Sequence, residues 1–294
     1  MRVTETMIFQ RTTDRANAAL VNVAKAQSQV SSGLRVVAPG DDPQAAGMLV
    51  RHRFDQTRIT AIQSGAQRAL DELNASDSAL EGVKSSLARA QVLATQFGND
   101  TYSAADRASA AEEVDGLFKQ VMGDLNTRFG DRYLFGGFKD NQPPFDASGG
   151  YNGDTGVRQV EVAPGVYDDA SVRADLMAKG VGGGVDILQG LQDLSTALRS
   201  NDGDSIRASI DNLQTGLDQV SAARSRVGTS VNIFTSTVNE CSLQILDKKK
   251  VISELGDADV LDASSKLSLA QYALNATLTA ASKTLDFSLV NLLK

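Results

Sequence analysis

Both ends of this chain carry a long stripe of apolar residues, and the stretch between the two ends is rich in turns. The apolar residues alternate between four- and three-residue spacing, which places them on one face of a helix. Chain ends are usually the least ordered part of a domain. Such stripes at both ends therefore predict terminal helices that pair with each other and with other copies of the chain. The residues assigned to this assembly seam are Phe9, Leu20, Val23, Val30, Leu34, Leu267, Leu274, Leu278, Leu285 and Leu292.

Composition narrows the fold and the possible partners. The chain has 294 residues, of which 41% are hydrophobic but only 5% aromatic, with no tryptophan. Alanine, leucine and valine must therefore supply the packing, which suits slim helical bundles. The net charge of −7 argues against nucleic acid as a partner. Residues 131–202 hold eleven acids against six bases, a net of −5, which suits a solvated, outward-facing lobe.

Most of the chain reads as helix. Apolar periodicity predicts helices over about 4–33, 43–97, 103–129 and 186–199, then a long helix to residue 255 and a last helix to the end. Asp42 precedes Pro43 as an N-cap, Ser103 caps the third helix, and Gly130 marks its expected end. The order of elements is nearly a palindrome, so antiparallel pairing of each outer element with its counterpart buries every apolar stripe.

These patterns predict a mainly α fold with a small β-rich insertion. The expected architecture is a long antiparallel helical coiled coil or bundle, forming a rod whose N- and C-terminal helices are paired. Residues 1–42 and 256–294 are predicted to form a terminal coiled coil, and 43–130 and 203–255 a long-helix domain. Residues 131–202 are predicted to form an exposed β-rich lobe with one short helix, because glycine, proline and aspartate punctuate short runs there.

The sequence offers little support for an enzymatic function. Cys241, the only cysteine, falls on the apolar stripe of its helix, so it is expected to be a buried small hydrophobe. His52, the only histidine, has no cysteine or serine motif to act with. The Gly182–Gly184 run lacks the spacing of phosphate-binding loops. The sequence therefore predicts no catalytic residues, no cofactor and no metal site, although a cytosolic enzyme or a regulatory coiled coil stays open as a rival class.

The terminal stripes differ from the inner ones in their surroundings. The stripes over 59–97 and 206–255 are expected to form the core of one chain. The terminal helices are set apart by Pro39-Gly40 and by Gly256, so by themselves they make a thin two-stranded contact. The last helix also carries apolar residues off its stripe, which predicts further burial against neighbouring copies. These residues are Leu269, Leu289, Val290 and Leu293.

Four stretches carry a resemblance to a known family. They are the MRxxxxM opening over 1–7, the SSGLRV…PGDDP element within 29–43, the YLFGG motif at 133–137 with Pro144-Phe145, and the closing helix over 259–293. On these motifs the chain resembles the flagellin superfamily and, within it, the hook-associated protein 3 family. The resemblance implies a structural subunit that joins the neighbouring hook-associated junction protein to the flagellin filament. A flagellin that forms the filament itself is the alternative.

The resemblance also implies how such a subunit reaches its place. The N-terminus has no apolar signal region and no stretch is long enough to span a membrane, so no cleaved signal peptide is expected. Members of the family leave the cell unfolded through the flagellar export apparatus, helped by an export chaperone, and assemble as a ring of copies outside the cell on the flagellum. Neither a membrane nor nucleic acid is an expected partner. Tyr133, Leu134 and Phe135 are expected to anchor the lobe, with an ordinary core strand the equal alternative.

Overall fold

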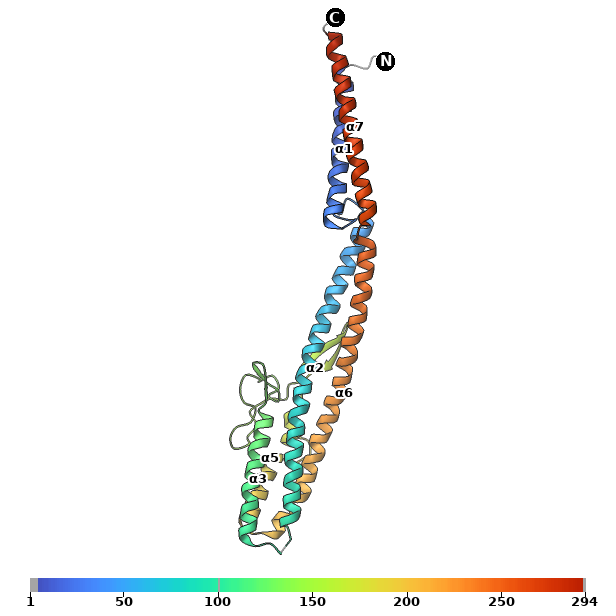
Figure 1. Cartoon of the computed structure of the whole chain (residues 1–294). Helices are drawn as coiled ribbons and strands as arrows, with labels where there is room; N and C mark the ends of the chain where they lie inside the picture. The colour runs from blue at the N-terminus through green and yellow to red at the C-terminus, as the bar shows by residue number, and fades with distance from the viewer. Residues whose placement is uncertain (1–4, 100, 293–294) are drawn as a thin grey trace. The chain divides into compact units, whose positions relative to one another are not determined.

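The computed structural model describes the backbone of residues 5–99 and 101–292 (Figure 1). The side chains of residues 5, 6, 8 and 284–292 lie outside that description. The helices are α1 (Glu5–Ser32), α2 (Pro43–Phe97), α3 (Ala104–Leu125), α4 (Ala174–Ala178), α5 (Ile187–Arg199), α6 (Gly203–Gly256) and α7 (Val260–Leu292). The strands are β1 (Arg128–Phe129), β2 (Arg132–Tyr133), β3 (Gln159–Ala163) and β4 (Val166–Asp169).

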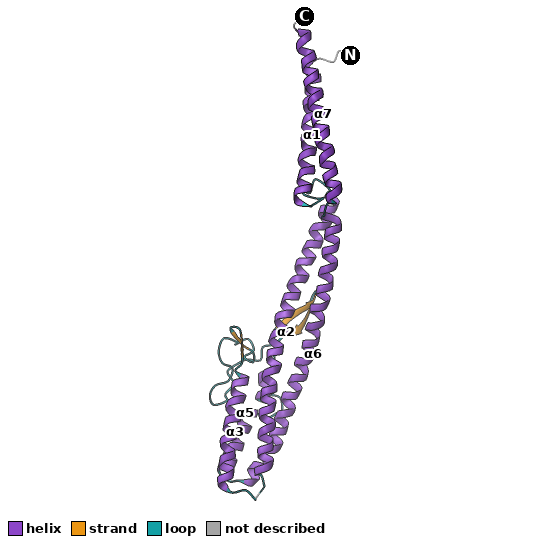
Figure 2. Cartoon of the chain, viewed as in Figure 1, coloured by secondary structure: helices purple, strands orange, loops and turns teal. Residues whose placement is uncertain are grey.

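Among the residues that the structure describes, the strands form two small antiparallel hairpins, β1–β2 and β3–β4 (Figure 2). The β3–β4 ladder pairs Gln159 with Asp169 and has an irregularity between Glu161 and Ala163. Helices make up most of the described residues. The predicted class, mainly α with a small β insertion and flagellin-like helical ends, is confirmed.

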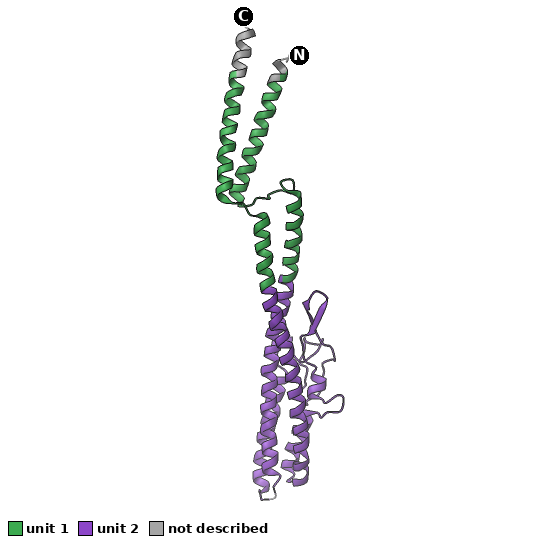
Figure 3. Ribbon diagram, turned by 90° about the vertical axis from the view of Figure 1, so that its right-hand side faces the viewer, with its two compact units in different colours: residues 1–59, 243–294 green, residues 60–242 purple. Residues whose placement is uncertain are grey.

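The chain divides into two compact units (Figure 3). Unit 1 contains residues 1–59 and 243–294, and unit 2 contains residues 60–242. The helices α2 and α6 each contribute a part to both units. The predicted three-part division into terminal coiled coil, long-helix domain and lobe remains a prediction.

Helix ends follow the expected capping chemistry. Asp42 Oδ1 accepts the N–H of Ala45 at 3.0 Å, which caps α2 ahead of Pro43. Ser103 and Asp106 form a reciprocal capping box at the start of α3. Asp259 Oδ1 accepts the N–H of Leu261 at 2.9 Å at the start of α7. Local polar residues thus fix where these three helices begin.

The predicted end of the third helix was wrong. The helix α3 stops at Leu125 instead of Phe129, and Gly130 lies in the turn of the β1–β2 hairpin with φ of +59°. The reason is a contact distant in sequence. The side-chain amide of Asn126 donates to Phe145 O and accepts from Phe145 N, both at 3.0 Å. These paired hydrogen bonds stabilise the conformation in which the chain leaves the helix at Asn126.

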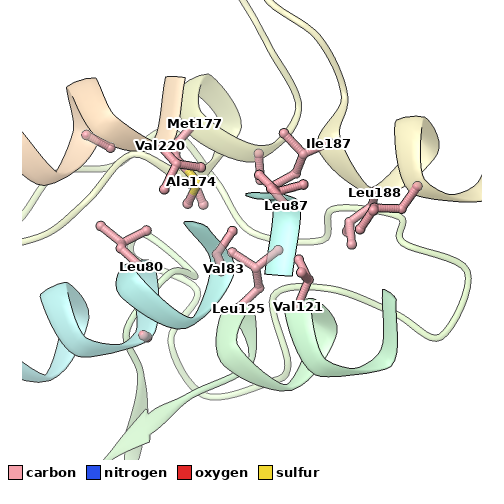
Figure 4. Packing of buried hydrophobic residues seen from close by; sticks show 14 of the residues in the cluster. Leu80, Val83, Leu87, Val121, Leu125, Ala174, Met177, Ile187, Leu188 and Val220 are labelled. Carbon is pink, nitrogen blue, oxygen red and sulfur yellow. The ribbon is translucent and has the colours of Figure 1, made fainter. Parts of the chain in front are cut away.

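Unit 2 holds a continuous hydrophobic core. The apolar stripe of α2 is buried there almost as predicted, with Leu80, Val83 and Leu87 fully enclosed. Figure 4 shows Val83 and Leu87 near Val121 and Leu125 from α3, with Leu80 farther along α2. Side chains from α4, α5 and α6 complete the cluster, and Figure 4 labels Ala174, Met177, Ile187, Leu188 and Val220 among them. At roughly 1.5–3 kcal/mol per large buried side chain, this core stabilises unit 2 without help from another chain.

A buried arginine closes one end of unit 2. Arg107 is only 4% exposed, and its guanidinium donates to the carbonyls of Phe97, Asn99 and Asn201. It also donates to Asn201 Oδ1 at 2.7 Å. Asn201 has φ of +57°, a conformation that asparagine tolerates better than most residues. The Arg107 guanidinium, near the start of α3, therefore provides hydrogen-bond donors for the backbone carbonyls at the end of α2 and in the connection between α5 and α6.

Unit 1 consists of two helix pairs. The helices α1 and α7 lie side by side (Figures 1 and 3). The first part of α2, residues 43–59, pairs with the last part of α6, residues 243–256. An ion pair of 2.8 Å between Lys248 Nζ and Asp55 Oδ2 joins them. Lys248, a polar exception on the α6 stripe, thus has an acidic partner across the pair.

Candidate assembly surfaces

The members of the terminal seam whose side chains the structure describes are only partly enclosed by the α1–α7 pair. Val23, Val30, Leu34, Leu267 and Leu274 are half-buried. Leu285 and Leu292 lie outside the described side chains. The exposed members of the seam are Phe9, at 56%, Leu20, at 51%, and Leu278, at 49%.

Small residues take the most enclosed positions of this helix pair. Ala26 is 6% exposed and Ala263 only 3%. Alanine lets two helix backbones approach closely but buries little apolar area. A pair built this way leaves its larger side chains in water.

Further apolar side chains add to that exposed surface. Leu261 is 83% exposed and Tyr272 is 74% exposed. Single exposed apolar residues are common, but a concentration of them marks an interaction site. We define the terminal apolar surface as Phe9, Leu20, Val21, Leu261, Leu269, Tyr272 and Leu278, all exposed in the free chain.

The two connections that flank this helix pair are tied together. Arg35 N donates to Gly256 O at 2.7 Å, and Ala258 N donates to Gly33 O at 2.8 Å. The Arg35 guanidinium adds bonds of 2.6 Å to Leu255 O and 2.9 Å to Asp42. The hydrogen bond from the N–H of Ala45 and, to a lesser extent, the one from this guanidinium hold the pKa of the Asp42 carboxyl below its ordinary value. The segment that follows α1 and the segment that precedes α7 therefore form a hydrogen-bonded junction.

The second helix pair of unit 1 carries apolar residues on two outward sides. On α2, Val50 and Phe54 are each 70% exposed and point away from the face where Asp55 meets α6. On α6, Leu243 is 60% exposed and Leu246 is 62% exposed, and both point away from α2. We call Val50 with Phe54 the α2 patch, and Leu243 with Leu246 the α6 patch. Neither patch was predicted, although Leu243 and Leu246 lie off the apolar stripe of α6 in the sequence.

The predicted lobe anchor is only partly buried. Leu134 is 4% exposed and Phe135 is fully buried within the unit 2 core. Tyr133 remains half-buried, with the Arg128 guanidinium 5.2 Å from its ring centre. The hydroxyl of Tyr151 donates toward Phe135 O, at 3.1 Å, and Asp154 O, at 2.9 Å. Burial, assisted by the Asp175 and Asp154 carboxylates, raises the pKa of Tyr151 to about 12, so this hydroxyl keeps its proton at neutral pH.

Two polar contacts that the sequence did not reveal hold the lobe to the helices. On α6, Gln219 accepts the N–H of Val185 at 2.6 Å and donates to Val185 O and Met177 O, both at 3.0 Å. On α2, the buried carboxylate of Glu72 accepts from Arg132 and Arg158, each at 2.5 Å. The partners lie 34 to 86 residues apart, so only the folded chain brings them together.

The described residues form no recognisable reaction centre. Cys241 is buried, as predicted, and burial with the nearby Glu240 carboxylate raises the pKa of its thiol. Among the residues that the structure describes, no group of three or more histidine, cysteine, aspartate or glutamate side chains is placed to hold a metal ion. No helix in the described part of the chain has the length and apolar character to cross a membrane.

Comparison with known proteins decides the family. The model described as bacterial flagellin N-terminal helical region matches residues 3–140, and the one described as bacterial flagellin C-terminal helical region matches residues 210–293. These two matches together take in well over half of the sequence. The chain belongs to the flagellin family. Structural proteins of the flagellin family are not enzymes.

Full-length relatives refine this placement within the flagellin family. The flagellar hook-associated protein 3 of Salmonella typhimurium is 27% identical over 300 residues, covering 94% of this chain and 95% of that protein. Its namesake from Escherichia coli is 27% identical over 317 residues, covering 100% of both. A putative flagellar hook-associated protein from Vibrio parahaemolyticus shares the fold, with a TM-score of 0.68 and 21% identity over 74% of this chain and 100% of that one. The predicted resemblance to hook-associated protein 3 is confirmed.

Proposed function

We propose that this chain is the subunit that joins the hook side of the flagellum to the flagellin filament. The observation that carries the proposal is the similarity to hook-associated protein 3 over 94–100% of the chain. Its partners would be the neighbouring hook-associated protein, flagellin and copies of itself in a ring. The exposed apolar surfaces of unit 1 support this proposal, because an assembly subunit needs surfaces that only neighbours cover.

The two units contribute differently to the proposed assembly. Unit 2 encloses its own core, whereas unit 1 leaves Phe9, Leu261 and Tyr272 more than half exposed. Covering a large apolar side chain is worth roughly 1.5–3 kcal/mol. Binding that covers several of them stabilises the bound state by mass action. We therefore assign the terminal apolar surface, which shares Phe9, Leu20 and Leu278 with the terminal seam, and the rest of that seam to contacts between subunits.

The α2 and α6 patches fit contacts around a ring. They point away from each other on one helix pair, so the same two patches cannot both face a single two-fold partner. A head-to-tail contact instead places the α2 patch of one copy against the α6 patch of the next, and such contacts close into a ring when the rotation allows it.

The proposal includes export of the chain before it folds. We infer that the subunit passes through the flagellar export apparatus with an uncleaved N-terminal signal, and that a chaperone covers the apolar residues of α7 beforehand. The exposure of Leu261, Leu269 and Tyr272 supports the need for such a cover. Folding of the terminal helices would then be completed against neighbours.

The alternative is a flagellin that builds the filament itself, which the flagellin descriptions of both matching family regions favour. Deleting the gene separates the two. A junction subunit predicts cells with completed hooks, no filaments, and intact flagellin in the medium, all restored by the wild-type gene. As a second readout, the purified chain should not form long filaments. Long filaments from the purified chain, or filaments on deletion cells, would contradict the proposal.

A further inference from the structure

A cavity of about 440 Å³ lies in unit 2 where the lobe meets α2. Arg68 and Glu72 of α2 line it, together with Arg132 of β2 and Arg158. Its remaining wall is largely apolar. The residues forming that wall include Gly65, Ala69, Phe138, Val157, Val160 and Ala170. The cavity is separate from the surfaces of unit 1 described above.

Positive charge exceeds negative charge around this cavity. Three arginines line it and Glu72 is the only acid among the lining residues. Asp140 stands nearby, 3.9 Å from Arg132 Nε. The balance remains positive even with Asp140 included. This is notable in a chain whose net charge is −7 and whose 131–202 segment is itself acidic.

Glu72 does not use all the hydrogen-bond donors that these arginines present. Its carboxylate takes one N–H from Arg132 and one from Arg158, while a guanidinium offers five. The Nε of Arg158 is buried and has no hydrogen-bond partner among the described residues. The Nε of Arg158 is unusual in this respect, because buried donors are rarely left unpaired in folded proteins. Arg68 lines the cavity one helical turn before Glu72; its side chain is exposed and makes no ion pair within the described part of the chain.

We propose that this cavity, the arginine pocket, binds an oxyanion. The forked guanidinium matches the two oxygens of a carboxylate or of a sulfate-like ion, and the apolar wall around it strengthens such contacts. Glu72 keeps Arg132 and Arg158 in place, and Arg68 and the unpaired donor of Arg158 supply the attraction. The oxyanion group could belong to an acidic side chain of another protein or to a free ion. Titration with an acidic peptide and with sulfate distinguishes these two sources.

Calorimetric titration of the full chain tests the arginine pocket. One arm adds tetraglutamate peptide and the other adds sodium sulfate against sodium chloride of equal ionic strength. Arg68→Gln removes one cation and leaves both Glu72 pairs intact. Arg53→Gln is the matched control, since Arg53 is exposed on the same helix but belongs to unit 1. Loss of one charge-assisted contact is expected to weaken binding about tenfold or more in Arg68→Gln, with no change in Arg53→Gln.

Comparison of the tetraglutamate and sulfate titrations identifies the source of the oxyanion. Saturable binding of tetraglutamate that Arg68→Gln weakens supports a protein carboxylate as the ligand. Saturable binding of sulfate alone, weakened by the same variant, supports a free ion. Binding of neither probe, or equal affinity in wild type, Arg68→Gln and Arg53→Gln, would overturn the proposal and leave the arginines as partners of Glu72 only. None of these outcomes depends on where the subunit sits in the flagellum.

Discussion

An aspartate in place of Leu274 is expected to abolish incorporation of the subunit into flagella, while unit 2 keeps its fold. Leu274 lies half-buried in α7 on the terminal seam. In the free chain a carboxylate there can still reach water. Once neighbouring subunits cover the seam, the charge would be buried without a partner, which costs several kcal/mol. The substitution is therefore expected to destabilise the assembled subunit more than the fold of the free chain.

The measurement compares the amount of subunit in sheared flagella with the amount secreted into the medium. Asn74→Asp is the charge control because it adds the same negative charge at an exposed helix position in unit 2, outside the terminal apolar surface. The control is expected to assemble normally. Circular dichroism of the purified Leu274→Asp chain should show nearly unchanged helix content. Wild-type levels of Leu274→Asp in flagella would refute the role given to the terminal seam.

Replacing Phe135 by alanine is expected to lower the free energy of unfolding of unit 2 by about 3–5 kcal/mol. Phe135 is fully buried in the core of that unit, so truncation leaves a cavity and removes packing between the lobe and the helices. Thermal or denaturant unfolding, followed by circular dichroism, measures the change.

Phe138→Ala provides the comparison for this second prediction. Phe138 follows Phe135 by three residues but is 65% exposed, so its loss should change stability by roughly 0.5 kcal/mol or less. Equal destabilisation by the two variants would argue against Phe135 as the anchor of the lobe. Retained stability in Phe135→Ala would argue against it more strongly.

The inner helices were predictable from sequence because their apolar stripes are long and regular. Nearly every stripe residue of α2 between Ile62 and Ala94 is buried in unit 2. Arg224, the other polar exception on the α6 stripe besides Lys248, could not be explained in advance. Its guanidinium meets both oxygens of Asp77, at 2.9 and 3.0 Å, across 147 residues of sequence. Periodicity shows which face of a helix is buried, but it does not identify the partner.

The lobe was less predictable because contacts distant in sequence build it. Val160 and Val162 alternate with Gln159 and Glu161, a pattern that predicts a strand, and β3 lies there. No such pattern predicted α4, and residues 131–202 hold two short helices where one was expected. Glu72 reads as a solvated charge on a helix, yet it is buried between two arginines. The packing of the terminal helices was also only partly predictable. The spacing of the terminal seam indicated which faces of the two helices pair, but it did not indicate that alanines would take the most buried positions.

Locating the subunit on intact flagella tests the central claim most directly. A short epitope inserted at the exposed β3–β4 turn, Pro164-Gly165, leaves the core of unit 2 intact and can be labelled with gold-conjugated antibody. Electron microscopy of sheared flagella that carry the hook is expected to show one cluster of gold, at the boundary between hook and filament. Gold distributed along the whole filament would contradict this account and identify the chain as a filament subunit.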